Sequence, residues 1–61
     1  MNKKQEIINC IKNSTRLSTS RVAGSVGIPF DYALKYLMEL EQEGEVQRTD
    51  ETNATYWEMK C

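Results

Sequence analysis

The chain has 61 residues and a formal net charge of −1, from eight basic and nine acidic side chains, and it contains no histidine. A chain of this length buries only about 60% of the surface that it exposes when unfolded, which excludes a large cofactor pocket. No apolar run approaches the ~20 residues of a membrane span, and the N-terminal stretch lacks the apolar core of a signal peptide.

The same composition argues against metal binding and catalysis. Without histidine or a CxxC pair, no zinc site is expected, and no nucleophile lies beside a base. We expect Cys10 and Cys61 to be free thiols in a reducing cytoplasm. The near balance of charge argues against strong DNA binding by the chain alone, because phosphate neutralisation supplies most of that affinity. We therefore expect a single domain, residues 1–61, that binds no cofactor, small-molecule substrate or membrane and is not an enzyme.

The first predicted element is an amphipathic helix over residues 3–13. Its apolar residues Ile7, Ile8 and Ile11 share one stripe, while the lysines of this segment face solvent. Such a helix needs a partner to cover its apolar stripe, so we expect it to pack against the rest of the domain.

A short strand and a brief helix follow. Leu17 is expected to be a strand residue that points inward. Ser18 or Thr19 then caps a helix over residues 20–26, because a side-chain hydroxyl can accept a hydrogen bond from an unpaired backbone N–H. The expected buried positions of this helix include Val26.

The stretch from Gly27 to Val46 predicts a tight turn, a third helix and the start of a strand. Gly27 can adopt a positive φ, and Pro29 suits the start of a helix. The expected apolar stripe comprises Phe30, Ala33, Tyr36, Leu37 and Leu40. The opposite, outward side comprises Asp31, Lys35, Met38 and Gln42. Gly44 then supplies the left-handed residue that ends a helix.

The last part of the chain predicts a β-hairpin. Val46 begins one strand, residues 49–53 are rich in turn formers, and residues 54–60 form a second strand with Trp57 on its inner face. Asn53 is the turn residue that best tolerates the left-handed region. The order helix, short strand, helix, helix, hairpin predicts a winged helix-turn-helix, an α+β fold that is mainly α.

Candidate DNA contacts gather on adjoining elements of this fold. Arg21 and Lys35 are the basic residues best placed for phosphates or bases, and Arg48 lies at the foot of the hairpin. The hydroxyls of Ser18 and Ser20 suit a phosphate, since backbone N–H groups converge at a helix N-terminus. Each residue alone is as well explained as a cap or a solvated charge, and only their combination favours DNA.

Four further residues of the third helix leave alternatives open. Asp31 either stabilises the helix N-terminus or accepts from a cytosine amino group. Tyr32 is a candidate contact to the DNA backbone or a base edge. Leu34 and Met38 either pack against the hairpin, or contact a thymine methyl group or a protein partner. The wing loop carries two acids and no base, so phosphate should repel its tip.

The segments Glu43–Arg48 (EGEVQR) and Ala54–Trp57 (ATYW) resemble the PapI/FaeA-like regulators of bacterial fimbrial operons. Shorter matches lie at residues 17–19, 22–23, 31–32, 36–37 and 40–42. The resemblance implies a small cytoplasmic winged-helix protein that works with the leucine-responsive regulatory protein (Lrp). It also implies a role in phase variation linked to adenine methylation of GATC sites. Two features differ: Leu34 stands where the pilus regulators carry an arginine, and the wing is acidic where theirs is basic.

These observations lead to one main hypothesis and two alternatives. The main hypothesis is a DNA-binding transcriptional regulator of a fimbrial, pilus or virulence operon that acts beside Lrp. The alternatives are a winged-helix protein–protein interaction module with little direct DNA binding, and a homodimer formed through the outward face. Domains that bind Z-form nucleic acid share the turn at Gly27 and Pro29, but need Asn and Tyr where Leu34 and Met38 stand, so we exclude that interpretation.

Overall fold

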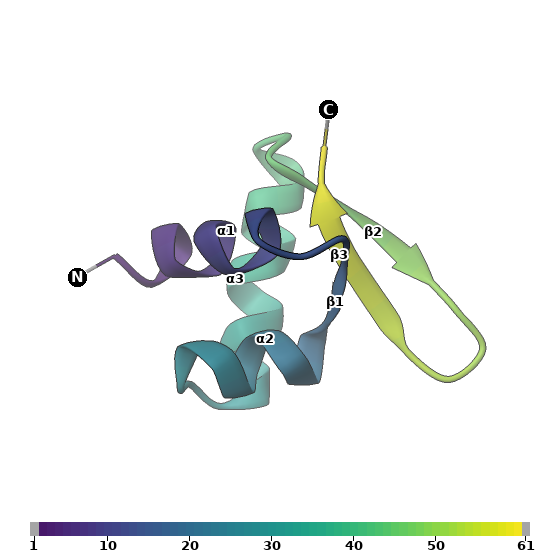
Figure 1. Cartoon of the computed structure of the whole chain (residues 1–61), viewed down its shortest axis with the longest axis horizontal. Helices are drawn as coiled ribbons and strands as arrows, with labels where there is room; N and C mark the ends of the chain where they lie inside the picture. Colours follow the sequence, from purple (N-terminus) through teal and green to yellow (C-terminus); the bar gives the residue numbers. More distant parts are fainter. Residues whose placement is uncertain (1, 61) are drawn as a thin grey trace.

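The order of elements along the chain is the one that the sequence predicts. The computed structural model describes residues 2–60. Its elements are α1 (Lys3–Lys12), β1 (Leu17–Ser18), α2 (Thr19–Val26), α3 (Phe30–Gln42), β2 (Val46–Asp50) and β3 (Thr55–Met59). The three strands form an antiparallel sheet in the order β1-β3-β2, and the β2–β3 hairpin extends away from the helices (Figure 1). This is a winged helix-turn-helix fold.

Two glycines determine where α2 and α3 end. Gly27 has a φ of 79°, and its N–H donates to the carbonyl of Ala23 at 2.8 Å. Gly44 has a φ of 82° directly after the C-cap of α3. Both conformations favour glycine because a Cβ would be strained there, and both predictions are confirmed. Asn53, the turn residue best able to tolerate the left-handed region, does not adopt it, since within residues 2–60 only these two glycines have a positive φ.

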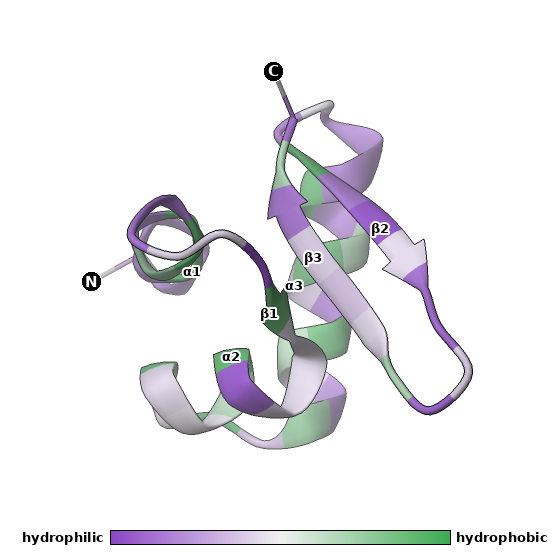
Figure 2. Cartoon of the chain, turned by 45° about the vertical axis from the view of Figure 1, so that its right-hand side comes forward, coloured by the Kyte–Doolittle hydropathy of each residue, from purple (hydrophilic) through white to green (hydrophobic). Residues whose placement is uncertain are grey.

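The core lies where the three helices meet the inner face of the sheet. Its buried apolar side chains are Ile7, Ile11, Val22, Ala23, Ala33, Leu37, Leu40, Val46 and Trp57. Every helix and both hairpin strands therefore contribute side chains to one cluster. Hydrophobic residues recur along the length of α3 (Figure 2). None of the helices in residues 2–60 has the length and apolar character that a membrane crossing needs.

Trp57 joins the sheet to the helices. Its side chain is completely buried, and its Cα lies opposite Leu17 of β1 and Arg48 of β2. The indole Nε1–H donates a hydrogen bond of 2.8 Å to the hydroxyl of Thr19, the first residue of α2. Thr19 is itself buried, and Ser18 rather than Thr19 caps the helix by accepting from the N–H of Arg21.

The third helix departs from its predicted apolar stripe at one end. Phe30 was expected in the core but is 49% exposed. It is the first residue of α3, and side chains on a helix lean toward the N-terminus, so its ring projects past the core. Val26, the last residue of α2, was expected to be buried but is half-buried.

The hairpin has a shorter loop than the sequence predicts. Thr49 was expected in the turn, but it pairs with Tyr56 inside the ladder, and Asp50 pairs with Thr55. The loop is closed by a hydrogen bond of 2.8 Å from the N–H of Glu51 to the carbonyl of Ala54. Threonine suits a strand as well as a turn, so its neighbours in the ladder decide its conformation.

Replacing Thr19 by valine should destabilise the fold by about 1–3 kcal/mol. The substitution keeps the shape of the side chain but leaves the buried indole N–H of Trp57 without an acceptor. Urea denaturation followed by tryptophan fluorescence measures the change. The matched control is Thr52→Val in the exposed hairpin loop, which should unfold at the same urea concentration as the wild type. Equal stability of the Thr19 variant would show that the hydrogen bond contributes nothing.

Candidate nucleic-acid interface

A shallow groove runs along the outward face of α3. The residues that line it are Asp31, Leu34, Lys35, Met38, Glu39 and Gln42. They come from successive turns of one helix, since residues three and four apart lie on the same face. The structure thereby confirms that Asp31, Lys35, Met38 and Gln42 face outward.

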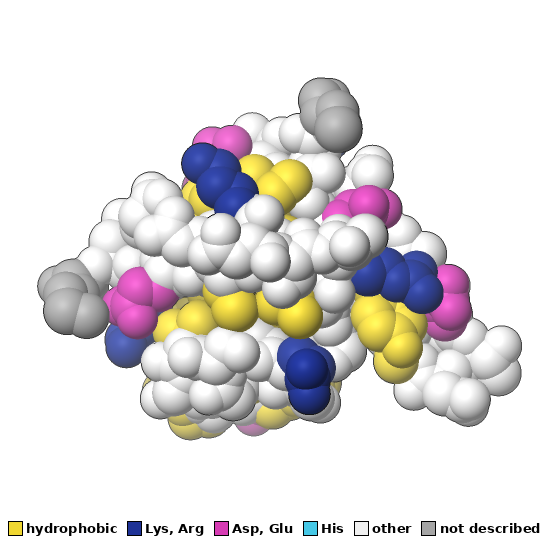
Figure 3. Space-filling model, viewed as in Figure 1, with side chains coloured by type: hydrophobic (Ala, Val, Ile, Leu, Met, Phe, Trp, Pro, Cys, Tyr) yellow, Lys and Arg dark blue, Asp and Glu magenta, His cyan; other side chains and the backbone are white. Residues whose placement is uncertain are grey.

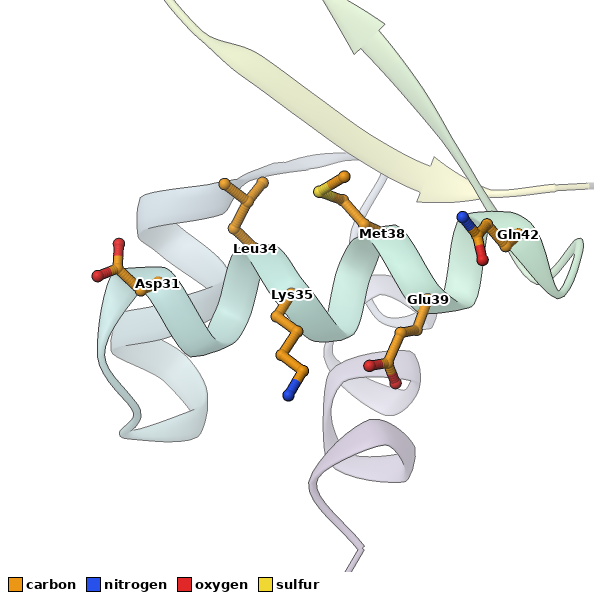
Figure 4. A pocket seen from close by; sticks show the side chains of 6 residues that line it. All are labelled: Asp31, Leu34, Lys35, Met38, Glu39 and Gln42. Carbon is orange, nitrogen blue, oxygen red and sulfur yellow. The ribbon is translucent and has the colours of Figure 1, made fainter.

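The groove has an apolar edge and a charged edge. Leu34 and Met38 point to the side of α3 where the hairpin lies, whereas Lys35 and Glu39 point to the opposite side (Figure 4). Leu34 is half-buried and packs against the core, while Met38 is 45% exposed. The sequence left open whether these two residues pack inward or project outward. In the structure Leu34 packs against the core, and Met38 projects into the groove.

A second hollow continues the groove toward α2. It lies between the start of α2, the start of α3 and the hairpin loop. Its lining residues are Ser18, Thr19, Ser20, Phe30, Leu34, Asn53, Ala54 and Thr55. Leu34 lines both hollows, so they form one continuous surface. The candidate residues Ser18 and Ser20 thus lie on the same surface as the groove of α3, and Tyr32 is exposed beside it at 58%.

The three candidate cations differ in how they are paired. Arg21 and Lys35 are exposed, and no carboxylate of residues 2–60 lies within 4.0 Å of either. The Nε of Arg48 lies 3.8 Å from the Oδ2 of Asp50, two residues along β2. On the face that Figure 3 shows, basic side chains are scattered, and most have an acidic side chain beside them. Arg21 and Lys35 are therefore the candidates with a charge available to a phosphate.

The two acids of the wing are held by neighbouring residues. Asp50 accepts a hydrogen bond of 3.0 Å from the hydroxyl of Thr55 and lies beside Arg48. Glu51 pairs with Nη1 of Arg16 at 3.2 Å. The guanidinium of Arg16 also stacks over the ring of Tyr56, 4.3 Å from its centroid. Sequence reasoning missed Arg16, because its partners lie 35 and 40 residues further along the chain.

A lysine of α1 holds the acids near the end of α3. The Nζ of Lys4 lies 2.7 Å from the Oε2 of Glu43 and 3.1 Å from the Oε1 of Glu39. The hydrogen bond to Glu43, followed by the one to Glu39, raises the pKa of Lys4 above the ordinary value of a lysine. Glu39 lines the groove, so Lys4 offsets one of its two negative charges. The other, Asp31, lies in the first turn of α3, where the helix dipole favours an acid.

Cys10 lines neither hollow of this surface. Cys10 is a half-buried free thiol on α1. Cys61 lies outside the described residues.

Substituting Glu43 by glutamine should lower the pKa of Lys4 toward its ordinary value. The substitution removes the charge of the main partner and leaves the side chain's length unchanged. The pair stabilises the fold at pH values below the ordinary lysine pKa, and that stabilisation is lost as the pH rises through the higher folded-state pKa. An NMR titration of the Lys4 side-chain carbon next to Nζ measures both proteins. An unchanged midpoint would mean that the pair does not persist in solution.

Comparison with known proteins supports the fold and identifies a relationship. The model of the family described as "FaeA-like protein" matches residues 3–61. No curated protein sequence matches the chain significantly.

Solved structures with the same fold come from several organisms. The chain is similar to the winged helix-turn-helix DNA-binding domain of Mb0332 from Mycobacterium bovis, a possible ArsR-family transcriptional regulator. Its TM-score is 0.92 at 16% identity, over 100% of this chain and 56% of that one. The adhesin competence repressor AdcR from Streptococcus pyogenes gives 0.88 at 21% identity, over 98% of this chain and 46% of that one. The chain thus spans about half the length of these two solved chains, the first of which is a fragment of residues 1–100.

A shorter structure is covered almost completely. The Zalpha domain of PKZ from Carassius auratus, solved in complex with Z-DNA, gives a TM-score of 0.85 at 16% identity, over 93% of this chain and 90% of that one. Identities this low show the fold alone. Leu34 and Met38 stand on the exposed side of α3 in this chain, which is where the sequence differs from the Z-form binding pattern.

Proposed function

The chain belongs to the FaeA-like protein family, and from this membership we propose that it is a DNA-binding regulator of transcription. The family is one of winged-helix regulators and not of enzymes. We place its action in the cytoplasm, at the promoter of a fimbrial, pilus or virulence operon. The resemblance of its EGEVQR and ATYW segments to fimbrial regulators supports this choice of promoter.

The observation that carries the proposal is that Arg21 and Lys35 are exposed and have no carboxylate of residues 2–60 within 4.0 Å. Arg21 lies on α2 and Lys35 on α3, the two helices that place a recognition helix on DNA in this fold. Lys35 lines the groove of α3, and Ser18 and Ser20 line the second hollow, which shares Leu34 with that groove. The proposed contact residues are Ser18, Ser20, Arg21, Asp31, Tyr32, Leu34, Lys35, Met38 and Arg48. The serines and basic residues would contact phosphates, and the outward residues of α3 would contact bases.

The same charges imply weak binding by the chain alone. Each phosphate that is neutralised contributes a slope of about −0.9 to the dependence of binding on salt. Four of the eight Lys and Arg side chains here, Lys3, Lys4, Arg16 and Arg48, already lie in ion pairs. We therefore propose that the protein acts beside Lrp and takes part in phase-variable expression. Lrp would supply most of the DNA affinity, and this chain would add contacts over a short stretch of promoter.

One observation favours a second candidate function. The apolar edge of the groove leaves Met38 45% exposed, and such a surface also suits a protein partner. On this alternative, α3 would bind a protein and DNA contact would be minor. The two functions differ in whether the chain binds Lrp when no DNA is present.

A mobility-shift assay at low salt tests the proposal directly. Fimbrial promoter DNA is mixed with the chain, with Lrp, and with both. We expect a weak shift or none with the chain alone, and a further shift of the Lrp complex when both are present. No shift and no further shift on any fimbrial promoter would contradict DNA binding. Binding to Lrp that is equally strong without DNA would favour the interaction module.

Replacing Lys35 by alanine should weaken DNA binding and reduce the salt slope by about one, as expected when a phosphate contact is removed. Lys35 is exposed and has no ion pair in residues 2–60, so the substitution should leave the fold unchanged. The matched control is Lys12→Ala, an exposed lysine in the last turn of α1 that lines neither hollow. Fluorescence anisotropy over a series of salt concentrations measures both slopes. Equal slopes for the two variants would remove Lys35 from the interface.

A further inference from the structure

The outward face of α3 has few groups that can recognise bases by hydrogen bonds. The helix carries no arginine and no asparagine, so Lys35 and Gln42 are its side chains that can pair with guanine or adenine through two hydrogen bonds. Gln42 is the last residue of the helix. One of the two acids that line the groove, Glu39, is held by Lys4 at 3.1 Å. In the middle of the face, Lys35 is therefore the side chain that remains for reading bases through polar contacts.

Its middle is instead apolar. Leu34 and Met38 are one helical turn apart and point to the same side of α3 (Figure 4). Both line the groove, and Met38 is exposed while Leu34 is supported from behind by the core. Methionine is unbranched and can adapt its shape to a ligand, whereas Leu34 is held by its packing against the core. The edge therefore combines an adaptable side chain with a fixed one.

We propose that this edge, Leu34 and Met38, recognises the 5-methyl group of pyrimidines in the major groove of DNA. The ligand is duplex DNA rich in A·T pairs, because the thymine methyl is the one apolar group that the bases present in that groove. This inference rests on the proposed function and names the sequence class that the same site reads.

The surroundings of the edge fit this ligand. A major groove about 12 Å wide admits an α-helix, and phosphates line both of its margins. Lys35 follows Leu34 on the helix and lines the same groove as Leu34 and Met38. It is exposed, and no carboxylate of residues 2–60 lies within 4.0 Å of it. An apolar edge with an unpaired cation on the same helix face is complementary to methyl groups that lie beside phosphates.

The test changes only the methyl group. One mixed-sequence duplex is made with thymine, with uracil in its place, and with uracil plus 5-methylcytosine for cytosine. Uracil lacks the 5-methyl group of thymine, and 5-methylcytosine restores a methyl at the same position of the groove. Affinities are measured by anisotropy at low salt, for the chain alone and for the chain added to an Lrp–DNA complex, with Lrp alone as the baseline.

We expect the uracil duplex to bind about fourfold more weakly for each thymine methyl that the edge buries, which is the factor that corresponds to one buried methyl group. The 5-methylcytosine duplex should recover part of that affinity. Met38→Gln should reduce the difference between the duplexes, because only Leu34 of the edge remains, and Met38→Leu should keep the full difference. The matched control Gln42→Ala, also exposed in the groove, should keep it as well. Met38 is exposed, so these variants should fold, as circular dichroism would confirm.

The outcomes separate this inference from the function on which it rests. Equal binding of the three duplexes by the wild type overturns methyl recognition and leaves DNA binding standing. A methyl dependence that is undiminished in Met38→Gln assigns the effect to DNA shape and also overturns the inference. Binding to none of the duplexes, with or without Lrp, overturns the proposed function together with the inference.

Discussion

The hydrogen bond between the indole of Trp57 and the hydroxyl of Thr19 fixes the arrangement on which the candidate interface depends. Trp57 occupies the middle strand of the sheet, and Thr19 begins the helix that precedes α3. Both groups are buried, so neither can exchange its partner for water. The bond therefore holds the hairpin at a fixed distance from α2. The second hollow is lined by residues from both sides of this connection, Ser18, Thr19 and Ser20 at the start of α2 and Asn53, Ala54 and Thr55 of the hairpin.

The net charge of −1 does not describe how charge is distributed on the surface, because half of the basic side chains lie in local ion pairs. Lys4, Arg16 and Arg48 each lie beside an acid of α3 or the wing. Exposed pairs of this kind contribute little stability, because water screens them. Their effect is instead on the surface: they offset acids that would repel a polyanion, and they occupy half of the cations that could attract one. A surface of this kind is neither repelled nor strongly drawn by DNA.

The sequence predicted what local signals determine and missed what distant contacts determine. Helix ends at Gly27 and Gly44 and the outward placement of Lys35 follow from residue type and spacing, and they are confirmed. The stacking of Arg16 on Tyr56 has no such signal, because it depends on how β1 aligns with β3. Thr49 was misplaced for the same reason, since its pairing with Tyr56 belongs to the ladder. The burial of Phe30 failed because helical spacing does not tell where the core ends.

Weak attraction to phosphate is consistent with a regulator that depends on a partner. A protein with many free cations binds all DNA and is distributed over the genome, because non-specific affinity is mainly electrostatic. A protein in which half of the basic side chains are paired with acids, and whose recognition edge is apolar, would gain less from random DNA. Held beside a larger DNA-binding protein, it would meet its site at a high effective concentration, and a few methyl or phosphate contacts would then suffice. On the proposed function, the paired charges of this chain thus favour dependence on the partner over independent binding.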